Sequence, residues 1–209
     1  MARVLATCSL VLLLACAAFA QTEQQAAPAP TTKGSKGVAD DLRFMIPADI
    51  KTIPLAVTYE KEPTGEVIIK INAKNSGVTV PLADAADSPA VKLTGHPESF
   101  YTLAMVDIDA PGGQGAADNT NYLHWLVVNI PGHLKEGDVV DTVAEYQAPA
   151  PPAGNHRYIF TVYEQAGFVT DPAPVADRVN FDYAAYPDSQ NTIGPVSAIY
   201  YIASAPAAQ

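Results

Sequence analysis

Residues 101–111 read YTLAMVDIDAP, and this segment carries most of what the sequence predicts about the fold. Its first half is apolar and rich in residues that favour β-strands. Its second half places Asp107 and Asp109 two positions apart, just before Pro111 and two glycines. Because alternate strand residues point to the same face, both carboxylates are predicted on one side of a strand end. A strand that ends in acids indicates a polar pocket at the rim of a core.

Two later segments share this design. Residues 124–130 read HWLVVNI and residues 156–163 read HRYIFTVY, so each begins with a histidine and continues as a strand-like run. A proline-rich loop, PAPPAGN at residues 149–155, precedes the second run. The three segments together predict one polar site built from strand ends.

These motifs resemble those of the phosphatidylethanolamine-binding protein family. The family's D-P-D-A-P motif is similar to DIDAP at residues 107–111, and its H-[FW]-L-V-V-N motif is similar to residues 124–129. Its G-x-H-R-Y and Y-E-Q motifs are similar to residues 154–158 and 163–165. The resemblance covers about residues 42–203. It implies a β-sandwich with a few peripheral helices and a small pocket that binds phosphate-like groups.

The residue pattern by itself also predicts a mainly β protein. Runs rich in Val, Ile, Tyr and Phe read as strands at residues 53–59, 66–72, 101–107, 125–130, 158–163 and 196–202. Turn residues separate these runs, and 18 prolines disfavour long helices. We therefore expect a central β-sandwich of antiparallel-rich sheets with a few short peripheral helices.

The ends of the chain predict a secreted protein. Arg3, an apolar run over residues 4–15 and A-F-A at residues 18–20 are typical of a signal peptide, assigned to residues 1–20. LLAC at residues 13–16 also resembles a bacterial lipoprotein box, but the later A-x-A favours ordinary cleavage. Both cysteines lie within the signal peptide, so no disulfide is expected in the mature chain. We expect a flexible linker at 21–40, the folded domain at 41–203 and a disordered tail at 204–209.

The charge balance argues against some partners. The chain has 22 acidic and 12 basic residues and a formal net charge of −10. Such a surface repels nucleic acid and anionic bilayers at long range. After the signal peptide no apolar run reaches the length of a membrane span. We expect neither nucleic-acid binding nor a transmembrane segment.

The resemblance implies ligand-binding roles for particular residues of this chain. They are Asp107, Asp109, His124, Pro152, His156, Tyr158 and Tyr201, with Tyr200 as a close alternative to Tyr201. Members of the family commonly end in a helix beside the pocket. Because this chain stops soon after residue 202, we expect that wall of the pocket to be built differently.

Elementary chemistry supports an anion site. A phosphate group needs hydrogen-bond donors, which His124, His156 and a tyrosine hydroxyl can supply. An aspartate of the pair would orient a histidine and keep it protonated. Alternatively, a carboxylate would face the ammonium of an ethanolamine headgroup, with Tyr158, Tyr201 or Trp125 as an aromatic face.

Each feature also has a plain structural interpretation. An Asp-x-Asp pair at a strand end is usually a turn former, and a single histidine at a strand start is usually a satisfied rim residue. Arg157 is predicted to point away from the pocket and to pair with a surface acid such as Glu164 or Asp182. The glycine-rich segment 111–122 is predicted to form a mobile rim without basic residues.

We therefore expect a secreted, non-enzymatic protein that binds phospholipid headgroups or small phosphate-like anions. The alternative is an extracellular protease inhibitor or signalling modulator that uses the two loops as contact surfaces. A metal-dependent enzyme is disfavoured, because the chain has no H-E-x-x-H or G-x-S-x-G motif and no mature cysteine nucleophile. No cofactor and no bound metal are expected.

Overall fold

The strands follow the predicted apolar runs. The computed structural model of the chain describes residues 42, 45–134, 140–182, 185–186 and 191–207. The elements are β1 (Leu55–Lys61), β2 (Glu66–Asn72), β3 (Val78–Thr79), the 3-10 helix η2 (Leu82–Ala85), β4 (Ala90–Leu93), β5 (Phe100–Ala110), β6 (Thr120–Pro131), β7 (Asp141–Ala144), β8 (Asn155–Gln165) and β9 (Thr192–Ser204). The predicted signal peptide at 1–20 and linker at 21–40 lie outside the described residues.

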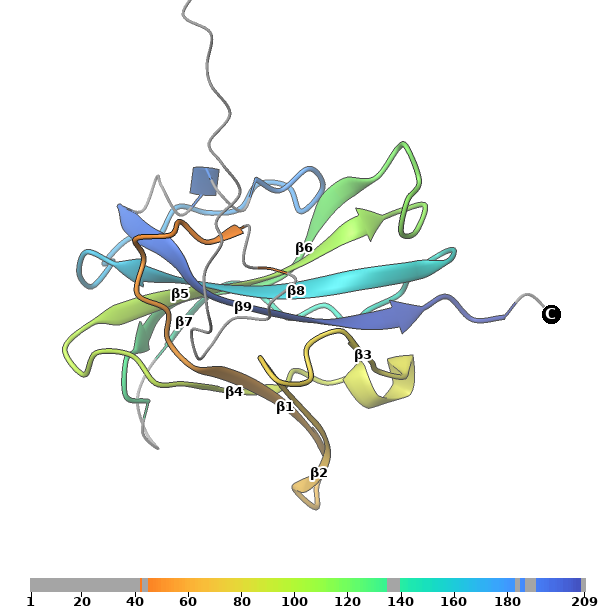
Figure 1. Cartoon of the computed structure of the whole chain (residues 1–209), viewed down its shortest axis with the longest axis horizontal. Helices are drawn as coiled ribbons and strands as arrows, with labels where there is room; N and C mark the ends of the chain where they lie inside the picture. The colour runs from red at the N-terminus through yellow and green to blue at the C-terminus, as the bar shows by residue number, and fades with distance from the viewer. Residues whose placement is uncertain (1–41, 43–44, 135–139, 183–184, 187–190, 208–209) are drawn as a thin grey trace, which may run out of the picture.

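Two sheets stack face to face (Figure 1). The smaller sheet has the order β2-β1-β4, and the larger has the order β3-β9-β8-β5-β6-β7. The paired strands are antiparallel apart from β3, which runs parallel to β9. This arrangement confirms the predicted mainly β sandwich. Within the described residues, no helix is both long and apolar enough to cross a bilayer.

The large sheet is buried on both faces. Leu103, Met105 and Phe160 point toward the small sheet, where they meet Leu55 and Val57 of β1. On the outer face, Leu42 and Ile46 pack against Ile159 and Ala198, while Ala104, Val106 and Phe181 form a further cluster. A strand covered on both faces has no polar face to alternate with its apolar one. The continuous apolar run at the start of residues 101–111 follows from this burial.

All of the predicted strands are present, but several extend farther than expected. β5 continues to Ala110 and β6 begins at Thr120, because pairing persists beyond the apolar residues that marked each run. The short strands β3, β4 and β7 were missed. Strands of two to four residues carry too little periodic pattern to be recognised in the sequence.

The predicted disordered tail begins too early. Ala203 is buried and Ser204 ends β9, where its hydroxyl donates to Asn155 Oδ1 over 2.7 Å. The N–H of Ala205 donates to the carbonyl of Gly154 over 2.8 Å. The small residues at the end of the chain looked structureless, but cross-strand bonds to β8 order them. Residues 208 and 209 lie outside the described part.

Antiparallel pairing brings four strand termini together at one end of the large sheet. The end of β5 and the end of β9 meet the beginnings of β6 and β8. The register places Tyr122, Asp107, Tyr158 and Tyr201 in one row across β6, β5, β8 and β9. Residues separated by nearly 80 positions in the chain are thereby neighbours, and this row forms the base of the site.

Candidate functional site

A pocket of about 260 Å³ opens at this end of the sheet, where the strand termini meet. It is lined by Asp107, Ala110, Pro111, Tyr122, His124, Gln147, Ala148, Ala150, Pro151, Pro152, His156 and Tyr158. Five of the seven predicted site residues therefore face it, namely Asp107, His124, Pro152, His156 and Tyr158. The other two, Asp109 and Tyr201, lie close by but do not line the pocket.

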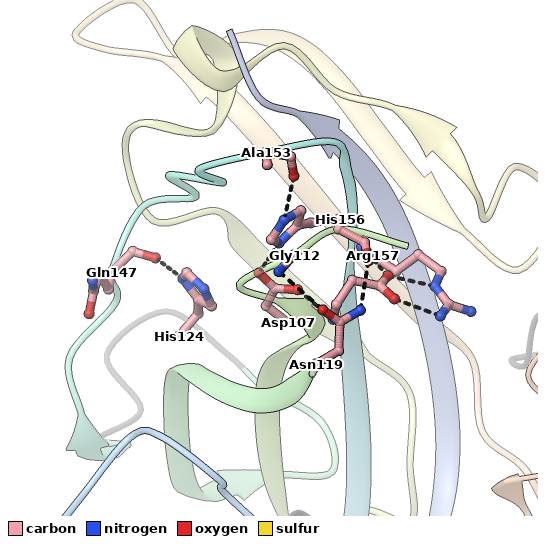
Figure 2. A network of polar contacts seen from close by, with 10 residues as sticks. Asp107, Gly112, Asn119, His124, Gln147, Ala153, His156 and Arg157 are labelled. Atoms are coloured by element: carbon pink, nitrogen blue, oxygen red, sulfur yellow. Dashed lines mark hydrogen bonds and ion pairs between the residues drawn. The ribbon is translucent and has the colours of Figure 1, made fainter. Parts of the chain in front are cut away.

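Asp107 and His156 form a buried ion pair in the wall of the pocket. His156 Nδ1 lies 2.7 Å from Asp107 Oδ2, and His156 Nε2 lies 2.9 Å from the carbonyl oxygen of Ala153 (Figure 2). Both ring nitrogens therefore face acceptors, and an imidazolium with a proton on each satisfies both. The prediction that His156 donates to a ligand is not supported by this geometry, because both of its nitrogens are already bonded within the protein.

Asp107 has a second role that matches the plain structural interpretation. Its Oδ1 accepts the backbone N–H of Asp109 over 2.9 Å, as the side chain of a turn-forming aspartate does. The carboxylate is therefore held at both oxygens. It orients the histidine and shapes the strand end at the same time.

His124 is held through one nitrogen and leaves the other available. Its Nδ1–H donates to the carbonyl of Gln147 over 2.7 Å, and Nε2 has no partner among the described residues. Burial lowers the pKa of His124 below its ordinary value, and the charges of Arg178 and His156 lower it further. The hydrogen bond to Gln147 and the charge of Asp107 oppose this shift without reversing it. At neutral pH the ring is therefore neutral and Nε2 is an acceptor, whereas protonation turns Nε2 into a donor.

Tyr158 brings an unsatisfied hydroxyl to the pocket. The side chain is fully buried, and its Oη makes no hydrogen bond of good geometry among the described residues, although the Asp107 carboxylate lies close enough to interact with it. Burial, followed by the charge of Asp107, raises the pKa of Tyr158. The group consequently remains a phenol, which can donate a proton to a ligand. Buried polar groups are almost always paired, so an unpaired one in a pocket wall points to a missing partner.

Tyr201 supports the pocket from behind. Its ring stacks on Tyr158 with centroids 5.2 Å apart, and its hydroxyl accepts a hydrogen bond from Tyr59 over 3.2 Å. Tyr201 does not line the pocket, so its predicted contact with a ligand stays a prediction that this geometry does not support. Tyr200, the alternative, belongs to the cluster on the outer face of the sheet.

Asp109 pairs with Arg157, which corrects two predictions. Arg157 donates to Asp109 from Nε over 2.7 Å, from Nη2 over 2.9 Å and from its backbone N–H over 3.0 Å. Figure 2 shows the Arg157 side chain directed away from His124 and His156. Arg157 thus leaves the pocket as expected, but its partner is Asp109 and not Glu164 or Asp182. Asp109 is used in locking β5 to β8, and the two aspartates do not act as one acid pair.

The glycine-rich rim is held by hydrogen bonds, contrary to the prediction of a mobile loop. Asn119 accepts from the N–H of Gly112 over 3.1 Å and donates to the carbonyl of Gly113 over 2.6 Å. The N–H of Gln114 donates to Asn155 over 2.7 Å. Gly113 has a φ of 88°, and a Cβ there would lie 2.9 Å from the carbonyl oxygen of Ala153. Glycine is required because the rim packs directly on the proline-rich loop.

Tyr122 and Gln147 line the pocket and were missed from the sequence. The hydroxyl of Tyr122 donates to Gln147 Oε1 over 3.0 Å, and its ring contacts that of His124. Tyr122 precedes His124 by two residues, so strand alternation is a signal that would have found it. Gln147 has no such signal. Trp125, predicted as an aromatic face, instead packs against Tyr146 and does not line the pocket.

The described residues contain no group of three or more His, Cys, Asp or Glu side chains placed to hold a metal ion. Asp107 and His156 bond to each other, while Asp109 bonds to Arg157. The two acids and two histidines therefore do not converge on a common point.

Comparison with known proteins gives a consistent result. The family model described as phosphatidylethanolamine-binding protein matches residues 70–193. Protein MOTHER of FT and TFL1 homolog 2 from Oryza sativa subsp. japonica is 41% identical over 105 residues, which cover 49% of this chain and 59% of that protein. The 26 kDa secreted antigen of Toxocara canis is 31% identical over 156 residues, which cover 71% of this chain and 59% of the antigen. The chain spans about three fifths of the length of these two relatives.

Two solved structures share the fold. The phosphatidylethanolamine-binding protein from Plasmodium vivax aligns with a TM-score of 0.61 at 18% identity and covers 83% of this chain and 100% of its own. A carboxypeptidase Y inhibitor, solved in complex with its cognate proteinase, aligns with a TM-score of 0.58 at 20% identity and covers 75% and 85%. At these identities the similarity shows the fold alone.

Proposed function

The chain belongs to the phosphatidylethanolamine-binding protein family, and from that premise we propose that its strand-end pocket binds small phosphate-bearing ligands such as a phospholipid headgroup. The observation that carries the proposal is the hydroxyl of Tyr158, a buried donor in the pocket wall that makes no hydrogen bond of good geometry within the described residues. A phosphate oxygen supplies the acceptor that this hydroxyl lacks.

The charges around the pocket are compatible with an anion. Asp107 is the acid that lines the pocket, and its Oδ2 is engaged by His156 Nδ1 over 2.7 Å. His124 Nε2 becomes a second donor when the ring is protonated, so a bound anion and a proton on His124 favour each other. A phosphate ligand would then bridge Tyr158 and His124, whose rings lie 5.1 Å apart between centroids. Hydrogen bonds to a charged ligand are stronger than bonds between neutral groups.

An ethanolamine headgroup also carries an ammonium, for which the rim offers oxygen acceptors and one aromatic ring. Tyr122 is the aromatic side chain beside His124 at the mouth, and Gln147 holds it by a hydrogen bond. A cation against the face of a tyrosine gains about 0.5–1 kcal/mol at an exposed site. This contribution is small, so we propose that the phosphate dominates affinity and that the amine modulates it.

We propose a binding role and not catalysis. His124 Nε2 is free to exchange a proton with a ligand, but an acid–base mechanism also needs a partner group, and the other candidates are engaged in contacts within the protein. His156 is bonded at both nitrogens, and Asp109 is held by Arg157. The alternative of a protease inhibitor or signalling modulator stays a prediction, since the similarity to the carboxypeptidase Y inhibitor supports the fold alone.

Calorimetric titration tests the proposed ligand. O-phosphoethanolamine, inorganic phosphate and ethanolamine are titrated separately into the protein and into the His124→Gln variant. We expect both phosphate compounds to bind the wild-type protein, more tightly at about pH 6 than at about pH 8, and to bind the variant weakly. The proposal fails if no compound binds with a Kd of about 1 mM or tighter, which corresponds to a binding free energy of about 4 kcal/mol. Tryptophan fluorescence is a poor substitute, because Trp125 does not line the pocket.

We also propose that the protein is secreted. The signal-like residues 1–20 support this proposal, as does the relative described as a secreted antigen. Expression of the full chain in cultured eukaryotic cells should release protein into the medium with Gln21 as its first residue. Retention in the cell of a chain that still begins at Met1 contradicts it.

A further inference from the structure

Arg178 contacts the backbone of the pocket wall from a segment that the motifs did not mark. It lies between β8 and β9, where residues 178–181 pair with the beginning of β6. The carbonyl of Arg178 accepts the N–H of Leu123 over 2.9 Å, and Val179 bridges to Tyr122. This segment therefore lies beside the part of β6 that carries His124.

The Arg178 side chain joins two walls of the pocket. Its Nη1 donates to the carbonyls of Leu123 and His124, each over 3.1 Å. Its Nη2 donates to the carbonyl of Glu145 over 2.8 Å. Among the described residues these bonds go to backbone oxygens and not to a carboxylate. One planar guanidinium thereby connects β6 with the segment that leads into Gln147.

These two walls meet at the His124 ring. The N–H of Gln147 donates to the His124 carbonyl over 2.8 Å, and His124 Nδ1 donates to the Gln147 carbonyl over 2.7 Å. The direction of Nε2 consequently depends on the spacing between β6 and residues 145–147. The fork of Arg178 spans that spacing, in addition to the solvent-exposed hydrogen bond between Tyr122 of β6 and the Gln147 side chain.

We propose that Arg178 is a positioning residue of the pocket, whose guanidinium fork holds β6 and residues 145–147 at the spacing that aims His124 Nε2 at the ligand. The inference rests on the proposed function and names a residue on which the affinity of the pocket for its ligand depends. A lysine preserves the positive charge but donates from a single point, so it cannot bond both walls in one fixed plane. A glutamine removes the charge as well.

The two substitutions separate geometry from charge. The charged and titratable groups around His124 are Asp107, His156, Arg178, Tyr122 and Tyr158. Arg178→Gln removes one positive charge from this set, which raises the pKa of His124. Arg178→Lys keeps that charge, so any loss of affinity in this variant reports on the fork alone.

The experiment compares wild type, Arg178→Lys and Arg178→Gln by calorimetry with O-phosphoethanolamine. Lys70→Gln, an exposed residue on β2 in the other sheet, is the matched control for one unit of charge. We expect both Arg178 variants to bind about tenfold more weakly, equivalent to about 1.4 kcal/mol, and the control to bind as wild type does. Wild-type affinity in folded Arg178→Lys overturns the proposal.

A second readout needs no ligand. Nitrogen-15 NMR of the His124 ring should show the single Nδ1–H tautomer in wild type and a mixture of tautomers in Arg178→Lys. If wild type fails to bind phosphoethanolamine, the proposed function falls, but this measurement still decides the role of Arg178. An unchanged tautomer in Arg178→Lys overturns the positioning role. Unfolding of both Arg178 variants also overturns it, because Arg178 would then serve the stability of the fold.

Discussion

Replacing Tyr158 with phenylalanine should make the protein more stable and its pocket weaker. The substitution removes only the hydroxyl group, which is buried and makes no hydrogen bond of good geometry among the described residues. The aromatic ring remains stacked on Tyr201, so packing changes little. Tyr158→Phe therefore isolates the contribution of a single unsatisfied donor.

The two effects have opposite signs and comparable sizes. Leaving a buried polar group unsatisfied costs about 1–3 kcal/mol, so its removal should raise the free energy of unfolding by about 1 kcal/mol or more. A hydrogen bond to a charged ligand contributes about 1.5–3 kcal/mol. Loss of that bond should weaken binding of O-phosphoethanolamine by about 10- to 150-fold.

The assay combines urea unfolding with calorimetry, and Tyr146→Phe is the matched control. The hydroxyl of Tyr146 donates to the carbonyl of Ala85 over 2.8 Å, and this residue does not line the pocket. Tyr146→Phe should therefore lower the free energy of unfolding by about 1 kcal/mol and leave binding unchanged. A Tyr158→Phe protein that is less stable than wild type and binds equally well would refute the reasoning, because the hydroxyl would then have a structural partner.

Further predictions follow from the same contacts. Asp107→Asn breaks the buried pair with His156 and should lower the free energy of unfolding by about 3 kcal/mol in urea titrations, and a loss below about 1 kcal/mol contradicts the pair. The pKa of His124 in the folded protein is lowered from 6.5, so just below that pH the unfolded state binds more protons than the folded state. The free energy of unfolding should therefore fall as the pH decreases from about 6.5 toward the pKa of folded His124. His124→Gln should remove this part of the slope in unfolding measured at several pH values. Gly113→Ala places a Cβ against the Ala153 carbonyl and should destabilise the protein by more than Gly115→Ala, which has a similar φ of 89° but no atom within 4 Å. Equal losses in thermal unfolding would show that φ strain alone matters, at about 1–2 kcal/mol for each site.

Local pattern was sufficient for the sandwich and for much of the pocket. The apolar, β-rich residues 101–106 predicted a strand, and the histidines at 124 and 156 marked the beginnings of two others. The strand-end pattern predicted one polar site that contains Asp107, His124 and His156. Resemblance to family motifs added Pro152 and Tyr158 to that site.

Hydrogen-bond partners could not be predicted in the same way. Strand alternation placed Asp107 and Asp109 together and sent Arg157 to a distant acid, but the β5–β8 register brings Arg157 beside Asp109. The glycines of the rim suggested mobility, although Asn119 and the proline-rich loop hold them. Arg178 was not singled out, because it bonds to backbone carbonyls. Every residue has such a carbonyl, so these contacts cannot be recognised from residue types.

The sequence by itself determined the fold class, the strands that carry the site and the residue types available at their ends. Alternation and apolar runs are local properties, and burial acts on them directly. Only the tertiary structure decided which nitrogen or hydroxyl remains free for a ligand. That outcome depends on register and loop contacts between residues far apart in the chain: His156 is bonded at both nitrogens, whereas His124 Nε2 and the Tyr158 hydroxyl are left without partners in the described structure.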